Sequence, residues 1–156
     1  MHRKVTSVEW ARACERPRAI PRTRHARGTK AKGLAYERAL YRAMCGSGFT
    51  FQHGQWFAFH ADGKLGFCQP DFVYPSSAII VIECKLTNIE QATEQLLDLY
   101  FPVLRAAYDR PVRGIIAVRS VHRCPDLAHI TTSLREAIDV AETKVPVLHW
   151  IGKGAL

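Results

Sequence analysis

The chain has 156 residues, 47% of them hydrophobic, and a formal net charge of +8. This length suits one domain with a buried core, and no apolar run approaches the roughly 18 residues of a transmembrane helix, so we expect no membrane association. The five cysteines include no Cys-x-x-Cys pair, which argues against a disulfide framework or a zinc site. We therefore expect the reducing cytoplasm of a bacterial, archaeal or phage-infected cell.

The positive charge is concentrated at the N-terminus. Residues 1–32 contain ten Lys or Arg against two Glu, and the rest of the chain is neutral. We predict a basic arm over residues 1–30 that binds nucleic acid, followed by a domain over residues 31–156. A solvated tail or, less readily, an organelle import signal would have the same composition. The predicted DNA-contacting cations are Arg16, Arg18, Arg22, Arg24, Arg27, Lys30 and Lys32.

The first half of the chain predicts two helices and then strands. A short helix is expected over Val5–Cys14, followed by an extended linker that contains proline and glycine. A second helix is expected from about Lys32 to Cys45. Phe49–His60 is rich in aromatic residues and predicts a strand interrupted at Gly54. The Asp62-Gly63 dipeptide is typical of a hairpin turn that leads into a further strand.

The second half alternates strands and helices. Asn88 is a suitable N-cap for a long helix, which Pro102 should kink or split near Asp98. The other expected elements are strands over Asp71–Tyr74, Ile79–Cys84, Val112–Arg119 and Val145–Ile151 and a helix over Thr132–Glu142. This order predicts an α/β fold with a mixed central sheet flanked by helices.

Charged side chains meet at the end of one predicted hairpin. Ile79–Ile82 is a β-branched run typical of a buried strand. A tight hairpin places Asp71 beside Glu83, and strand alternation puts Lys85 on the same face as Glu83 and Cys84 on the other. Two carboxylates and an ammonium group predict a divalent-metal site beside a lysine; the alternative is a salt bridge at a strand end.

Glu37 interrupts the apolar stripe of the second predicted helix. At helical spacing it falls beside Leu40 and Tyr41, facing the core. A glutamate in that position needs a cation, and Arg38 and Arg42 lie off the stripe. Glu37 is therefore either a functional carboxylate or one half of a buried ion pair with a distant basic residue.

Three patterns together resemble the PD-(D/E)XK nuclease superfamily. Gln69-Pro70-Asp71 precedes Glu83-Cys84-Lys85 at the end of an Ile/Val strand. The segment Lys32-Gly33-Leu34-Ala35-Tyr36-Glu37-Arg38, followed by Gly48-Phe49, is similar to the first helix and next strand of archaeal-type Holliday-junction resolvases. The resemblance covers about residues 30–120. It implies a restriction-endonuclease-like fold with an αβββαβ core, a mixed central sheet and flanking helices.

The resemblance also implies a chemistry, namely phosphodiester hydrolysis of DNA with Mg²⁺ or Mn²⁺. Such hard cations take oxygen ligands, which here would be Asp71, Glu83, Glu37 and the backbone carbonyl of Cys84. Glu37 would bind a second metal or orient a metal-bound water. Lys85 would lower the pKa of the attacking water or stabilise the developing charge. Gln69 would position the nucleophile or the phosphate.

Several functions remain open within this resemblance. The leading one is an endonuclease in recombination, repair or phage DNA processing, acting as a homodimer because paired cuts need two active sites. Exonuclease members often carry Gln-x-x-x-Tyr after the lysine, a spacing that Gln91, Gln95 and Tyr100 miss. A nicking or exonucleolytic nuclease on ends or single strands is one alternative. A non-catalytic nucleic-acid-binding module on the same fold is the other.

Two further groups of residues have simpler interpretations. Trp56, Phe57 and Phe59 could stack on bases, but aromatic residues in a strand more often belong to a core. Histidines 53 and 60 and Cys68 match no metal-ligand spacing, so we interpret them as scattered strand residues.

Overall fold

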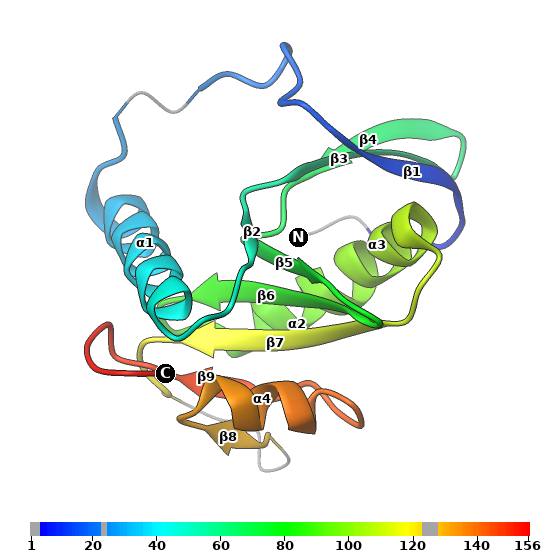
Figure 1. Ribbon diagram of the computed structural model, residues 1–156. Coiled ribbons are helices and arrows are strands. Elements are labelled where there is room, and N and C mark those ends of the chain that lie inside the picture. Colours follow the sequence, from blue (N-terminus) through cyan, green and yellow to red (C-terminus); the bar gives the residue numbers. More distant parts are fainter. Residues whose placement is uncertain (1–3, 23–24, 123–127) are drawn as a thin grey trace.

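The computed structural model describes residues 4–22, 25–122 and 128–156, which form two β-sheets and flanking helices (Figure 1). The elements in chain order are β1 (Val8–Cys14), α1 (Gly28–Gly46), β2 (Gln52–His53), β3 (Trp56–Ala61), β4 (Lys64–Cys68), β5 (Phe72–Pro75), β6 (Ile79–Lys85), α2 (Ile89–Gln95), η1 (Leu96–Tyr100, a π-helical turn), α3 (Phe101–Tyr108), β7 (Val112–Val118), β8 (Ile130–Thr131), α4 (Leu134–Val140) and β9 (Val147–His149). Within these described residues, no helix is both long and apolar enough to cross a bilayer.

The larger sheet is mixed and forms the centre of the molecule. Its strand order is β2-β5-β6-β7-β9-β8, with β5 and β6 antiparallel and β6, β7 and β9 parallel. Alternate residues of β6 enter two different cores. Ile80 and Ile82 pack with α1 and α4, whereas Ile79 and Val81 pack with α2 and α3. Burial on both sides explains the uninterrupted β-branched run and confirms the expected α/β fold with flanking helices.

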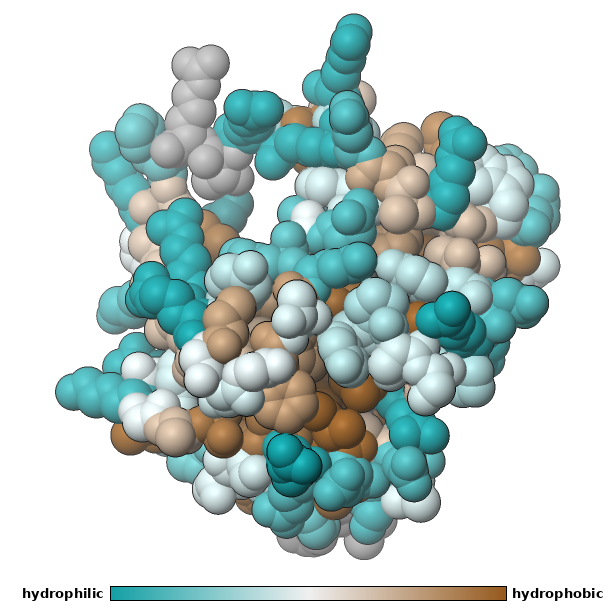
Figure 2. All heavy atoms as spheres, viewed as in Figure 1, coloured by the Kyte–Doolittle hydropathy of each residue, from teal (hydrophilic) through white to brown (hydrophobic). Residues whose placement is uncertain are grey.

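Figure 2 views the side of the molecule that carries α1 and α4. Apolar side chains lie across the middle of this face, and hydrophilic side chains surround them. The core beneath contains Leu40 and Met44 of α1, Leu134 of α4 and Ile115 of β7, all of them fully buried. These contacts hold α1 against this face of the larger sheet.

The segment Val8–Cys14 is a strand, so the expected helix is wrong. β1 pairs with β3 in antiparallel register, with Ala11 opposite Phe59 and Ala13 opposite Phe57. The Asp62 carboxylate anchors the start of β1, because Oδ1 accepts hydrogen bonds from Thr6 Oγ1 (2.6 Å) and from the Ser7 backbone (3.2 Å). Pairing with a distant strand overrides the local helical spacing.

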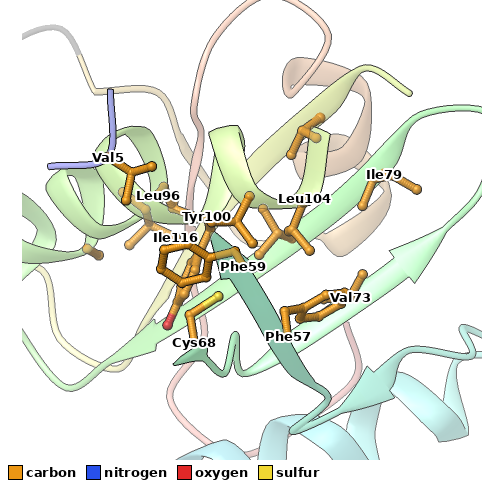
Figure 3. Packing of buried hydrophobic residues seen from close by; sticks show 14 of the residues in the cluster. Val5, Phe57, Phe59, Cys68, Val73, Ile79, Leu96, Tyr100, Leu104 and Ile116 are labelled. Carbon is orange, nitrogen blue, oxygen red and sulfur yellow. The ribbon is translucent and has the colours of Figure 1, made fainter. Parts of the chain in front are cut away.

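The smaller sheet has the strand order β1-β3-β4 and packs against α3. The expected hairpin at Asp62-Gly63 is confirmed, since both residues have positive φ (52° and 72°) as a tight turn requires. Phe57 and Phe59 are buried between β3 and α3, which confirms their interpretation as core residues (Figure 3). A Cβ at position 66 would come within 2.5 Å of the Phe59 ring, so glycine is needed there.

The helix after β6 is divided as expected, but by a π-helical turn. Its start is capped by Asn88, whose Oδ1 accepts a hydrogen bond from the Gln91 backbone at 2.9 Å. Pro102 cannot donate to the carbonyl of Asp98. The backbone N–H of Val5 takes that place, at 2.8 Å from the Asp98 oxygen. The division near Asp98 is therefore confirmed, and the N-terminal residues complete the helix.

The expected C-terminal elements are present but shorter. The helix covers Leu134–Val140 and the last strand covers Val147–His149. The two-residue strand β8, Ile130–Thr131, was not expected. It pairs in parallel with β9, and so short a segment has no detectable alternation.

Candidate active site

A pocket of about 360 Å³ opens where the C-terminal end of β6 meets the first half of α1. Four of the five predicted catalytic residues line it: Glu37, Asp71, Glu83 and Lys85. The remaining lining residues are Thr29, Lys30, Gly33, Leu34, Tyr36, Cys84, Leu86, Thr87, Asn88 and Gln91. The structure thus brings together acidic residues from α1, from the start of β5 and from the end of β6.

The hairpin register positions Asp71 as expected. Phe72 pairs with Ile82, so the next position outward on each strand holds Asp71 and Glu83. The Cys84 backbone N–H donates a hydrogen bond to Asp71 Oδ2 at 2.7 Å. This bond orients one carboxylate oxygen towards the backbone at the end of β6.

Glu83 is buried, with 2% of its surface exposed. Lys85 Nζ donates to Glu83 Oε1 at 2.6 Å, whereas Oε2 has no hydrogen-bond partner among the described residues. Burial raises the pKa of the Glu83 carboxyl, and the neighbouring Lys85 ammonium and Tyr100 hydroxyl lower it. A buried carboxylate oxygen without a partner is costly unless a proton or a cation binds it.

Asp71 is the most strongly affected acid of the pocket. Burial, followed by the charges of Glu83 and Glu37, raises its pKa well above the ordinary value of 3.8. The Cys84 N–H and the Lys85 ammonium oppose this shift. The negative charges of three carboxylates therefore repel one another in one pocket. Either protonation or a bound cation would reduce this repulsion.

The donor set fits Mg²⁺ or Mn²⁺ chemically. Both ions prefer oxygen ligands, and Mg²⁺ is usually held by one or two carboxylates with water completing the shell. The unpartnered Glu83 Oε2 is the atom that most clearly needs such an ion. Across the described ranges, however, no three His, Cys, Asp or Glu side chains stand in a ready metal-binding cluster. Asp71, Glu83 and the Cys84 carbonyl would hold the metal with water as the remaining ligand.

Glu37 reaches the pocket from α1 and is paired with a histidine. His53 Nε2 lies 2.6 Å from Glu37 Oε1, and the His53 ring stacks against both Tyr41 and Phe72, whose ring centroids lie 4.8 and 5.0 Å away. His53 is thus the distant basic partner that one of the two alternatives expected, and a functional role of Glu37 stays a prediction. Sequence patterns did not connect His53 with Glu37, because β2 comes beside α1 only through its pairing with β5.

A hydrogen-bond chain connects Lys85 to the π-helical turn. Lys85 Nζ donates to Gln95 Oε1 at 3.1 Å, and Gln95 Nε2 donates to the Tyr100 hydroxyl. Tyr100 in turn donates to the Gln69 carbonyl at 3.1 Å. Burial raises the pKa of Tyr100, so the hydroxyl keeps its proton. Figure 3 shows its oxygen at the edge of the apolar cluster, beside Cys68.

The π-helical turn explains why sequence spacing missed this contact. Gln95 and Tyr100 are one residue further apart than in Gln-x-x-x-Tyr. A turn with i→i+5 hydrogen bonds holds one residue more than an α-helical turn, so the two side chains still meet. π-Helical turns of this kind are frequent at functional sites.

Gln69 differs from the other predicted catalytic residues because it does not line the pocket. Its side chain donates to the Gly54 carbonyl at 2.8 Å. Gly54 also donates its N–H to the Asp71 carbonyl at 3.0 Å and has a φ of 65°. Gln69 therefore helps to hold the backbone that presents Asp71.

The predicted DNA-contacting cations lie in different places. Lys30 lines the pocket, and Lys32 is exposed one helical turn away from Tyr36 on the same helix. The Arg16 guanidinium lies 5.7 Å from the centre of the Trp56 ring. Arg18, Arg22 and Arg27 are also exposed, on the segment between β1 and α1, while Arg24 lies outside the described residues.

Comparison with known proteins leaves the family undetermined. No protein-family model and no curated protein matches the chain. A similar solved structure is that of a type III CRISPR defence DNA nuclease activated by cyclic oligoadenylate, at 18% identity and a TM-score of 0.41. The match covers 78% of this chain and 22% of that one. A likeness at this level carries no argument about activity.

Proposed function

We propose that this protein is a metal-dependent deoxyribonuclease of the PD-(D/E)XK type. The observation that carries the proposal is Glu83, a buried glutamate with one oxygen on Lys85 and the other without a partner, in a pocket that also holds Asp71 and Glu37. A structural salt bridge needs only Glu83 and Lys85. It does not account for the two further carboxylates in the same pocket, whose repulsion costs stability.

The proposed chemistry is hydrolysis of a phosphodiester bond. A Mg²⁺ or Mn²⁺ ion held by Asp71, Glu83 and the Cys84 carbonyl would lower the pKa of the attacking water and neutralise phosphate charge. The Lys85 ammonium, oriented by Glu83 and Gln95, would stabilise negative charge that develops on the phosphate. Glu37, oriented by His53, would align the water or bind a second metal.

DNA is the substrate that the charge distribution supports best. Lys30 lines the pocket, and the segment before α1 adds exposed arginines. Phosphate charge attracts such a surface without regard to sequence. We propose an endonuclease acting in recombination, repair or phage DNA processing, with a homodimer making paired cuts.

One observation favours a second candidate, a nuclease that acts on DNA ends or single strands. Gln95 and Tyr100 are hydrogen-bonded, and Gln95 contacts Lys85. The sequence resemblance associates a glutamine and a tyrosine on this helix with exonucleases. A relaxed circular duplex has no ends, so cutting of that substrate separates the two candidates.

The test is a substrate panel with Mg²⁺ and with EDTA. The panel contains a four-way junction, a linear duplex, a supercoiled plasmid, a relaxed circular duplex and a single strand. We expect Mg²⁺-dependent cleavage that Glu83→Gln and Lys85→Ala each reduce by about 10²-fold or more. DNA binding should survive in both variants. Glu142→Gln, which removes an exposed partner of Arg113, is the matched control.

Cleavage at the original rate by both variants would show that this pocket is not the active site. Binding without cleavage of any substrate would favour the third possibility, a nucleic-acid-binding module without catalysis.

A further inference from the structure

The outer face of the three-stranded sheet carries exposed aromatic and apolar side chains. Trp10, Leu65 and Phe67 are 41%, 57% and 39% exposed. Strand register places them together, because Trp10 and Leu65 both pair with His60, and Phe67 pairs with Ala58. Single exposed apolar residues need no explanation, whereas three on one small sheet mark a surface that binds something.

Arginines lie over both tryptophans of this outer face. The Arg12 guanidinium is 5.5 Å from the centre of the Trp10 ring, and that of Arg16 is 5.7 Å from the centre of the Trp56 ring. Register puts Arg12 beside Ala58 in the middle of the sheet. The His60 ring lies nearly parallel to the Trp10 ring, with an angle of 13° between them. Aromatic rings and two arginines therefore lie together on this surface, with one carboxylate, Glu9, whose Oε2 is 2.7 Å from His60 Nδ1.

We propose that this outer face binds single-stranded nucleic acid. Trp10, Trp56 and Phe67 would stack on bases, and Arg12 and Arg16 would contact phosphates. Stacking rings within a basic surface are the usual basis of binding to unpaired strands. A second copy of the chain is the less suitable occupant, because it would bring the same cations against each other.

The position of the outer face adds to this inference. In Figure 1 the segment after β1 leads from the three-stranded sheet to α1, where the candidate active site lies. That segment carries exposed Arg18 and Arg22, and Lys30 lines the pocket. Described basic residues thus occur both on the segment that follows the outer face and at the pocket. The inference concerns binding alone and holds whether or not the pocket cuts DNA.

Stacking predicts a preference for unpaired bases, because the bases of a duplex cannot be splayed onto a sheet surface. Binding is measured in EDTA by fluorescence anisotropy with labelled oligothymidylate, oligouridylate and a blunt duplex of equal length. We expect the single strands to bind more tightly than the duplex and to quench tryptophan fluorescence. Comparison of the two single strands shows whether the ligand is DNA or RNA.

The decisive variants are Trp10→Ala and Phe67→Ala. Each should weaken single-strand binding about tenfold and leave the salt slope unchanged, since no charge is removed. Trp10→Phe should restore most of the affinity. Arg12→Gln should lower both the affinity and the salt slope. Leu97→Ala, which truncates a side chain of similar exposure on the π-helical turn, is the control and should bind normally.

Three results would overturn the inference. Unchanged single-strand affinity in both alanine variants is the first, and an equal loss on the blunt duplex is the second. The third is a wild-type dimer that Trp10→Ala converts to monomer at unchanged affinity, which would make the outer face an interface between copies. Thermal melting shows whether each variant folds. If Trp10→Ala does not fold, quenching of tryptophan fluorescence in the wild-type protein tests whether bases stack on this face. Binding is measured in EDTA, where no metal-dependent cleavage occurs, so failure of this inference is distinct from failure of the nuclease proposal.

Discussion

Asp71 is buried in the candidate site beside two other carboxylates. Its pKa is raised by burial and by two neighbouring carboxylates, and a hydrogen bond from Cys84 offsets only part of this. The folded protein therefore prefers a protonated Asp71, while the unfolded chain ionises near 3.8. Stability from this group is present below 3.8 and is lost as the pH rises through the raised pKa of the folded state.

Asp71→Asn should remove the loss of stability that ionisation of Asp71 causes as the pH rises. An asparagine keeps an oxygen for the Cys84 N–H but carries no charge. In EDTA at neutral pH we expect the free energy of unfolding to rise by about 1 kcal/mol or more, with a flatter dependence on pH. Urea unfolding between pH 4 and pH 8 measures both quantities.

The same variant separates a metal site from an acidic cluster. Mg²⁺ should raise the melting temperature of the wild-type protein, and Asp71→Asn should lose most of this increase. An Asp71→Asn protein that is less stable than wild type at neutral pH, with the same response to Mg²⁺, would contradict the assignment of Asp71.

The π-helical turn follows Gln95, the last residue of α2, and brings Tyr100 within hydrogen-bonding reach of it. It contains one residue more than an α-helical turn, and Leu97 within it is 49% exposed. Deletion of Leu97 should convert the turn to α-helix and keep Gln95 near Tyr100, now at the common spacing. We expect a folded protein that retains nuclease activity within about tenfold, as measured by thermal melting and by the substrate panel.

Two matched changes test that expectation. Gly114→Ala should lower the stability of the protein more than Gln95→Ala does. The new Cβ would come within 2.7 Å of the Phe101 ring and 3.2 Å of Leu96. Gln95→Ala should lower activity without unfolding the chain. A ΔLeu97 protein that is unfolded, or as inactive as Lys85→Ala, would show that the π-helical turn itself is required.

Local patterns predicted the elements whose partners are close in sequence. The hairpin from Asp71 to Lys85 could be predicted because alternation and a short turn determine its register. β1 could not, because its pairing with β3 spans about fifty residues and Val8–Cys14 has no strict alternation of exposure. Local patterns also failed to predict two side-chain contacts. The contact of His53 with Glu37 depends on the order of strands in the sheet, and that of Gln95 with Tyr100 depends on an irregular helix.

Only part of the basic N-terminal segment lies outside the β-sheets. Residues 8–14 belong to a sheet, and the exposed cations follow in the segment that leads to α1. Deletion of residues 1–30 would remove β1 and uncover the core at Phe57 and Phe59. Charge neutralisation is therefore the better test of the basic segment.

Replacement of Arg18, Arg22 and Arg27 by glutamine should flatten the salt dependence of DNA binding. Each lost phosphate contact lowers the slope of log K against log salt by roughly 0.9, so the full effect is between about 1 and 3. The melting temperature should stay the same, because all three side chains are exposed. Titrations at several salt concentrations measure the slope.

A control with the same change in net charge is available elsewhere on the surface. Arg105, Arg135 and Lys144 are exposed and lie outside the segment between β1 and α1. Equal slopes for the two triple variants would mean that total charge, and not the basic segment, governs binding.

The hydrogen bond between Val5 and Asp98 ties the beginning of the chain to the helix that supports Lys85. Proteolytic trimming past Val5 would leave the Asp98 carbonyl without its donor, at the point where Pro102 cannot supply one. Loss of Val5 would then loosen the turn that carries Tyr100 and, through Gln95, the support of Lys85. A single backbone contact from a segment distant in sequence thus helps to position the lysine of the candidate site.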